Sequence, residues 1–166
     1  MSLEPVPEID VIIGTVIWLH SQGWKIDSIS VPKGKGIDHS ADTQKAKTKL
    51  SEANIEVHKI DFKSNGPDII GNLGSTICRI ECKGFGKGKN TTLDTSFDRA
   101  VASAVSYFDS KDSLRIGLAF PFHPVYLDLI EKKLPIALRQ VLNLWILIYV
   151  PDSNSVTDIS AISQIV

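Results

Sequence analysis

Three ionisable residues on two nearby segments, Asp68, Glu81 and Lys83, have the types and spacing of a hydrolytic centre. Segment 77–83 alternates apolar with charged residues, which is typical of a strand that turns one face toward a core. Because side chains alternate across a strand, Arg79, Glu81 and Lys83 are expected on one face, with Glu81 and Lys83 about 7 Å apart.

Asp68 is expected to join this row through a hairpin. Residues 64–67 (Ser-Asn-Gly-Pro) have turn chemistry, Asp68 opens an extended segment, and residues 71–74 (Gly-Asn-Leu-Gly) reverse the chain. Twelve residues separate Asp68 from Glu81. Since paired strands lie about 5 Å apart, the hairpin would bring the Asp68 carboxylate beside Glu81 and Lys83.

Two carboxylates and an ammonium in one row suit the hydrolysis of a phosphodiester. Asp68 and Glu81 could hold Mg²⁺, which prefers oxygen ligands and keeps positions for water and a phosphate oxygen. Such an ion lowers the pKa of water and stabilises charge on the phosphate, while Lys83 could orient the attacking water or neutralise phosphate oxygens. The backbone carbonyl of Cys82 could complete the ligand shell, and Mn²⁺ is an alternative ion.

Plainer interpretations of these residues stay open. An acid and a lysine two positions apart on a strand commonly form a solvated face. The pair Pro67-Asp68, taken alone, is ordinary turn chemistry.

The chain resembles the PD-(D/E)XK nuclease superfamily, which has the restriction-endonuclease-like fold. The matching residues are Pro67-Asp68 and, after twelve residues, Glu81-Cys82-Lys83, within a helix-strand-strand-strand-helix-strand order over residues 5–150. The resemblance implies that Asp68 and Glu81 are metal ligands and that Lys83 is the catalytic lysine. Many members also carry a carboxylate on the first helix, for which Glu8 is the candidate here. Otherwise Glu8 simply complements the helix dipole.

A glycine-rich basic loop follows the strand that carries Lys83. Residues 84–90 read Gly-Phe-Gly-Lys-Gly-Lys-Asn, which fits neither the Walker pattern nor G-x-G-x-x-G. We interpret Lys87 and Lys89 as contacts to nucleic-acid phosphates, the alternative being a solvated loop. Arg99, which lies off the apolar stripe of the following helix, is a further nucleic-acid-binding candidate.

The apolar periodicity along the chain predicts the elements around this centre. A helix is expected from Pro7 to near Gly23, then a short strand with Ile29 and Val31, a polar helix or irregular excursion over 33–54, and an extended segment over 55–62. After the hairpin we expect a helix with the stripe Phe97, Val101, Ala104 and Phe108, a strand over 114–120, a helix over 125–142 interrupted at Pro135, and a buried parallel strand over 144–150. Residues 151–166 show no pattern.

Hairpin strands followed by crossover helices predict an α/β fold. We expect a mixed central sheet with helices on both faces, arranged as in the restriction-endonuclease-like fold. With no repeat or linker, residues 1–166 are predicted to form a single nuclease-like domain with a core over 5–150 and a tail over 151–166.

The composition limits the partners and the compartment. The 166 residues carry a net charge of −1, so a nucleic-acid surface must be a local patch. Cys78 and Cys82 form neither a zinc framework nor a secreted disulfide pattern and are expected to face the core. The chain lacks a signal-like start and a long apolar run, so we expect a soluble, cytoplasmic protein that avoids membranes.

These observations favour a metal-dependent nuclease, with DNA as the expected partner and an endonuclease as the expected activity. A homodimer would suit the cutting of both strands of a duplex. Without a target-reading module in the sequence, restriction and repair roles stay open. A non-catalytic nucleic-acid-binding or assembly protein that retains the fold is the alternative from another class, whereas a small-ligand α/β protein would need a phosphate loop that is not present.

Overall fold

The computed structural model describes residues 4–31, 40–86, 90–109 and 113–161. The helices are α1 (Glu8–Ser21), α2 (Ser40–Glu52), α3 (Asn90–Ser106), α4 (Pro124–Lys133) and α5 (Ile136–Val141), with short 3-10 turns η1 (Val57–Lys59) and η2 (Pro151–Ser153). The strands are β1 (Lys25–Ser30), β2 (Asp61–Lys63), β3 (Ile69–Leu73), β4 (Thr76–Cys82), β5 (Leu114–Pro121), β6 (Leu144–Val150) and β7 (Ser155–Asp158).

The strands form one seven-stranded mixed sheet in the order β2-β1-β3-β4-β5-β6-β7. Strands β1, β3 and β4 pair antiparallel, whereas β4, β5 and β6 pair parallel and are joined by helical crossovers. The predicted α/β class and mixed sheet are therefore confirmed. The carboxyl ends of β1, β4, β5 and β6 all point to the same edge of the sheet.

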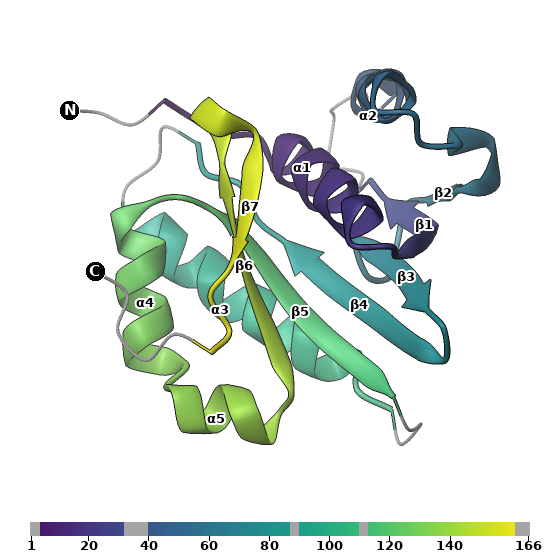
Figure 1. The fold of residues 1–166 in the computed structure, drawn as a ribbon. Helices are drawn as coiled ribbons and strands as arrows, with labels where there is room; N and C mark the ends of the chain where they lie inside the picture. The colour runs from purple at the N-terminus through teal and green to yellow at the C-terminus, as the bar shows by residue number, and fades with distance from the viewer. Residues whose placement is uncertain (1–3, 32–39, 87–89, 110–112, 162–166) are drawn as a thin grey trace.

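Helices cover both faces of the sheet, as expected (Figure 1). Helix α1 lies on one face, where Trp18 packs edge-on against Trp145 of β6 and Gly14 leaves room for the ring of Tyr149. Helix α3 lies on the other face, where Phe97 stacks on Phe120 of β5. The charged row of β4 belongs to this second face, because Glu81 pairs with Leu118, which has the same orientation as Phe120.

The start of α1 is attached to the end of β4. Pro7 is the N-cap residue of the helix, and the acids Glu8 and Asp10 occupy its first turn, where they complement the helix dipole. Just before them, Val6 and Phe85 exchange two backbone hydrogen bonds of 2.9 Å each. This bridge holds the first turn of α1 beside the residue that follows β4.

Helix α2 resolves the choice between a helix and an irregular excursion for the polar stretch. Its few apolar residues face inward, with Ala46 and Leu50 fully buried. Lys45 also forms an ion pair of 2.5 Å with Asp10 of α1. The part of the stretch before Ser40 lies outside the described residues.

Four expectations about the elements are wrong. The chain does not reverse over 71–74, because residues 71–73 belong to β3 and the tight turn is at Gly74 and Ser75. Residues 55–62 are not extended throughout, because η1 turns the chain before β2 begins at Asp61. Phe108 does not continue the buried stripe of α3: the helix ends at Ser106, and the Phe108 side chain is 70 % exposed. The segment after residue 150 is not featureless, since β7 pairs with β6 and the buried Arg139 donates hydrogen bonds to the carbonyls of Ile159 and Ser160.

The cysteine interpretation is confirmed, because both Cys78 and Cys82 are fully buried and unpaired. Burial raises the pKa of both thiols, which suppresses the reactive thiolate form. Among the described residues, no helix combines the length and the apolar character needed to cross a bilayer.

If α2 is an integral part of the fold, Leu50→Ala will lower the free energy of unfolding by about 2–5 kcal/mol, since it empties a fully buried leucine site. Urea denaturation followed by circular dichroism measures the change. The control is Thr48→Ala on the exposed side of the same helix, with an expected effect within about 0.5 kcal/mol. Equal stability of the two variants would show that α2 is only loosely attached.

Candidate active site

The charged row of β4 is buried, which excludes the solvated-face interpretation. Glu81 is only 7 % exposed, and Asp68 beside it is 4 % exposed. Lys83 follows directly after the last residue of β4 and is partly buried. Three ionisable groups at the edge of a sheet that otherwise buries apolar side chains are a costly arrangement unless they are paired with one another or with a ligand.

The hairpin places Asp68 where the spacing predicts it. Ile69 pairs with Ile80, and one further step in this antiparallel register sets Asp68 opposite Glu81. The Asp68 Oδ2 atom accepts a hydrogen bond of 2.7 Å from the backbone N–H of Cys82, between Glu81 and Lys83. Its Oδ1 atom makes no hydrogen bond with any residue that the structure describes.

The turn before Asp68 is fastened to the end of β1. The backbone N–H of Ser30 donates to the carbonyl of Asp68 at 2.9 Å, and the Ser30 hydroxyl donates to the carbonyl of Asn65 at 2.8 Å. Both bonds fix the turn against a neighbouring strand, so the Asp68 side chain is positioned by the sheet and not by the turn alone.

Lys83 connects the strand to the first helix. Its Nζ atom lies 2.7 Å from Oε1 of Glu81 and 3.5 Å from Oε2 of Glu8. The structure thus brings together Asp68, Glu81, Lys83 and Glu8, all four of the residues predicted to be catalytic. A role for Glu8 in the helix dipole alone does not account for its approach to Lys83.

Gly84 permits this approach of the first helix. A Cβ atom at this position would come within 2.4 Å of the backbone nitrogen of Glu8 and within 2.4 Å of the carbonyl oxygen of Val6. Any side chain at residue 84 would therefore push the first turn of α1 away from β4. A glycine here is a structural requirement for bringing Glu8 to Lys83.

Negative charge in a buried environment dominates the electrostatics of the cluster. Burial, followed by the charges of Glu81 and Glu8, raises the pKa of Asp68 to about 8. Burial also raises the pKa of Glu8. For Lys83 burial alone would lower the pKa, but the carboxylates of Glu8 and Glu81 outweigh it and raise the pKa, so the ammonium stays charged.

The oxygen donors and the negative charge of this cluster could accommodate a divalent cation. Three carboxylates face a single ammonium, so the fully ionised cluster carries two uncompensated negative charges (−3 + 1 = −2). Asp68 and Glu81 are the residues that would hold the ion, because Asp68 retains an oxygen without a partner among the described residues. Within the described ranges, no group of three or more His, Cys, Asp or Glu side chains is arranged as a metal cluster. Oxygens from the backbone or from a substrate would therefore have to complete the shell, and the ligand role of the Cys82 carbonyl stays a prediction.

Tyr107 is a member of the cluster that sequence reasoning missed. Its hydroxyl donates a hydrogen bond of 2.5 Å to Oε2 of Glu81. Arg79, interpreted from the sequence as a surface or ion-pairing residue, binds Asp109 at 2.9 Å and also donates to the backbone carbonyl of Tyr107 at 2.6 Å. The only signal in the sequence is that Tyr107 directly precedes Phe108, the last residue of the apolar stripe expected from the sequence.

The nucleic-acid-binding candidates are not brought into the cluster. Lys87 and Lys89 lie outside the described residues. Arg99 is exposed on α3 and makes no hydrogen bond or ion pair with the described part of the chain.

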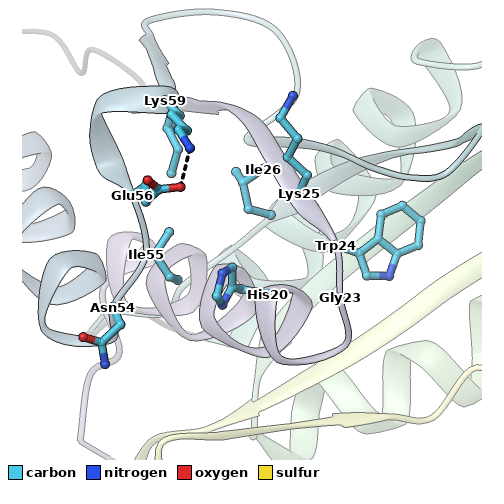
Figure 2. A pocket seen from close by; sticks show the side chains of 10 residues that line it. His20, Gly23, Trp24, Lys25, Ile26, Asn54, Ile55, Glu56 and Lys59 are labelled. Atoms are coloured by element: carbon cyan, nitrogen blue, oxygen red, sulfur yellow. Dashed lines mark hydrogen bonds and ion pairs between the residues drawn. The ribbon is translucent and has the colours of Figure 1, made fainter.

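The hollow shown in Figure 2 lies elsewhere, at the other end of α1. It has a volume of about 440 Å³ and is lined by residues from the end of α1 to the start of β1 and by residues in and around η1, among them His20, Lys25 and Ile55. Its carboxylate, Glu56, is paired with Lys59 at 2.5 Å. Since α1 is about 20 Å long, this hollow is remote from Glu8 and shares no residue with the acid–lysine cluster.

The fold and the cluster together define an α/β protein with a buried acid–lysine centre at the carboxyl edge of a mixed sheet. Comparison with family models, with curated proteins and with solved structures found no match to this chain.

The elevated pKa of Asp68 predicts a pH-dependent stability in the absence of divalent ions. A carboxyl group that holds its proton more tightly in the folded state stabilises the fold fully below its unfolded pKa, near 3.8, and loses this contribution as the pH rises through about 8. The free energy of unfolding should therefore fall over this interval in wild type and fall much less in Asp68→Asn, which cannot ionise but can still accept the Cys82 N–H.

Urea titrations in EDTA at pH 5, 6.5 and 8 would test this expectation. The control is Asp27→Asn, at an aspartate of β1 that accepts a hydrogen bond from Asn72 and lies outside the cluster. Parallel pH curves for wild type and Asp68→Asn would mean that Asp68 is ionised in the metal-free protein.

Proposed function

We propose that this protein is a metal-dependent nuclease that hydrolyses phosphodiester bonds, with DNA as its substrate and endonucleolytic cleavage as its activity. The observation that carries the proposal is the convergence of Asp68, Glu81, Glu8 and Lys83 from three separate segments at one edge of the sheet. A merely structural ion pair would need one acid for the lysine, whereas this cluster contains three.

The element order supports the same class of protein. Setting aside α2, η1 and β2, the chain runs α1, β1, β3, β4, α3, β5, which is the helix-strand-strand-strand-helix-strand order of the PD-(D/E)XK resemblance. Asp68 directly precedes β3, and Glu81 lies near the end of β4, so Pro67-Asp68 and Glu81-Cys82-Lys83 occupy corresponding ends of one hairpin. We therefore propose a restriction-endonuclease-like arrangement of the core.

Each residue of the cluster has a distinct task in this proposal. Asp68 and Glu81 would hold Mg²⁺, or Mn²⁺ in its place. The bound ion would supply a water of lowered pKa and positive charge near the phosphate. Lys83 keeps its proton and offers a directed ammonium to the attacking water or to the phosphate oxygens. Glu8 also pairs with Lys83, at 3.5 Å, and so limits where the ammonium can point.

The ionisation of Asp68 links ion binding to pH. A ligand carboxylate must lose its proton to bind a cation, so binding at Asp68 releases a proton at neutral pH. Cleavage should accordingly strengthen as the pH rises toward 8. The low net charge of the chain means that contacts to nucleic acid come from local groups, for which Lys87, Lys89 and Arg99 remain our candidates; a homodimer also remains a prediction.

One observation favours a second candidate function, a non-catalytic nucleic-acid-binding or assembly protein with the same fold. Lys83 is already paired with two acids, and the described residues do not by themselves form a three-ligand metal cluster. In that case the cluster would be a structural ion-pair network. Cleavage of DNA in the presence of Mg²⁺ separates the two candidates.

Lys83→Ala should reduce cleavage of supercoiled plasmid by about 100- to 1000-fold at saturating Mg²⁺, because it removes the ammonium but neither proposed ligand. Asp68→Asn should also be impaired, but higher Mg²⁺ should partly restore it, since its defect is in holding the ion. The measurement is the cleavage rate against Mg²⁺ concentration, with EDTA as the blank.

The matched control for Lys83 is Lys132→Ala, at an exposed lysine that is paired with Asp128 of the same helix. This variant should cut at the wild-type rate. A folded wild-type protein that fails to cut single-stranded, duplex or branched DNA with Mg²⁺ or Mn²⁺ would favour the non-catalytic candidate. Full activity of Lys83→Ala would remove the central residue from the mechanism.

A further inference from the structure

Glu81 is held by two donors from different elements. Lys83 binds its Oε1 atom at 2.7 Å, and the hydroxyl of Tyr107 binds its Oε2 atom at 2.5 Å. A carboxylate offers about four lone-pair positions, so two positions remain for a further partner. The direction in which these remaining positions point is determined by the two donors together.

Hydrogen bonds hold the backbone of Tyr107, although this residue lies beyond the last residue of α3. Its backbone N–H donates to the carbonyl of Ala104 at 3.1 Å, and its own carbonyl accepts the guanidinium of Arg79 at 2.6 Å. The other arm of Arg79 binds Asp109 at 2.9 Å. A residue two positions before Glu81 on the same strand thus anchors the backbone from which the phenol reaches Glu81.

The hydroxyl of Tyr107 acts as a donor over the whole working pH range. Burial, followed by the hydrogen bond and charge of Glu81, raises the pKa of the phenol well above its ordinary value. Without this donor the single strong partner of Glu81 would be Lys83, and the carboxylate would be free to rotate about that ion pair.

We propose that Tyr107 is a positioning residue, anchored by Arg79, that orients the Glu81 carboxylate to receive a divalent cation. The inference rests on the proposed metal-dependent function and adds to it a residue on the opposite side of Glu81 from Lys83. Partners that hydrogen-bond a metal ligand fix its orientation, and their loss costs about 10- to 100-fold in metal affinity.

The test measures binding of Mn²⁺ to the metal-free full-length protein by the loss of the electron paramagnetic resonance signal of free Mn²⁺, without any cleavage. Tyr107→Phe removes only the hydroxyl and should weaken Mn²⁺ binding by about 10-fold or more. Arg79→Lys, which keeps the charge but loses the forked contact, should weaken binding in the same direction by a smaller factor. The control is Tyr149→Phe, which loses a hydroxyl bonded to Asn154 at 3.1 Å on the other face of the sheet and should bind Mn²⁺ as wild type does.

The outcomes separate this inference from the proposed function. The inference and the proposed metal site are both supported if wild type binds Mn²⁺ and Asp68→Asn binds it less tightly. Tyr107→Phe must then also bind Mn²⁺ less tightly than Tyr149→Phe does, at comparable thermal stability. Equal or tighter binding by Tyr107→Phe overturns the inference and leaves the metal site standing. Wild type that binds no Mn²⁺ overturns both together. If Tyr107→Phe is unstable, unchanged Mn²⁺ binding by folded Arg79→Lys overturns the inference in its place.

Discussion

The antiparallel pairing of β3 with β4 is the interaction on which the centre depends. It sets Asp68 opposite Glu81 and lets the Asp68 carboxylate accept the backbone N–H of Cys82. That hydrogen bond, together with the charge of Lys83, favours the ionised form of a carboxylate that burial and two neighbouring acids push toward protonation. A shift of the register by one residue would turn the row of β4 to the opposite face and dissolve the cluster.

Other residues offset the electrostatic cost of placing the Asp68 carboxylate beside Glu81. Lys83 neutralises part of the charge of Glu81 and Glu8, and Tyr107 adds a neutral donor. The negative charge of the carboxylates that Lys83 does not neutralise would attract a cation. Replacing a buried ion pair by well-packed apolar side chains often leaves stability unchanged or improves it, so the concentration of carboxylates near Lys83 agrees with the ligand-binding centre that we propose.

The hairpin and its charged row could be predicted from the sequence because both depend on local rules. Turn residues at 64–67, together with alternation in β4, determine which side chains share a face, whereas the reversal expected over 71–74 lies at Gly74 and Ser75. The contribution of Tyr107 could not be predicted in this way. It depends on where α3 ends and on the hydrogen bond that Arg79, on β4, donates to the Tyr107 carbonyl. The extended assignment of 55–62 was wrong for a related reason: Ile55 and Ile60 are buried through a 3-10 turn, which has no distinct periodicity in so short a segment. Strand β7 was missed because an exposed edge strand carries mostly polar residues.

The bridge between Val6 and Phe85 has a consequence for the order in which the centre assembles. It closes a loop of nearly eighty residues, so its formation carries the entropy cost of a long-range contact. The hairpin alone can bring Asp68, Glu81 and Lys83 near one another, whereas Glu8 lies on α1 and joins them only when this helix packs beside the end of β4. A nascent or partly unfolded chain would consequently carry the motif without the complete cluster, and completion of the centre would report that the amino-terminal helix has docked.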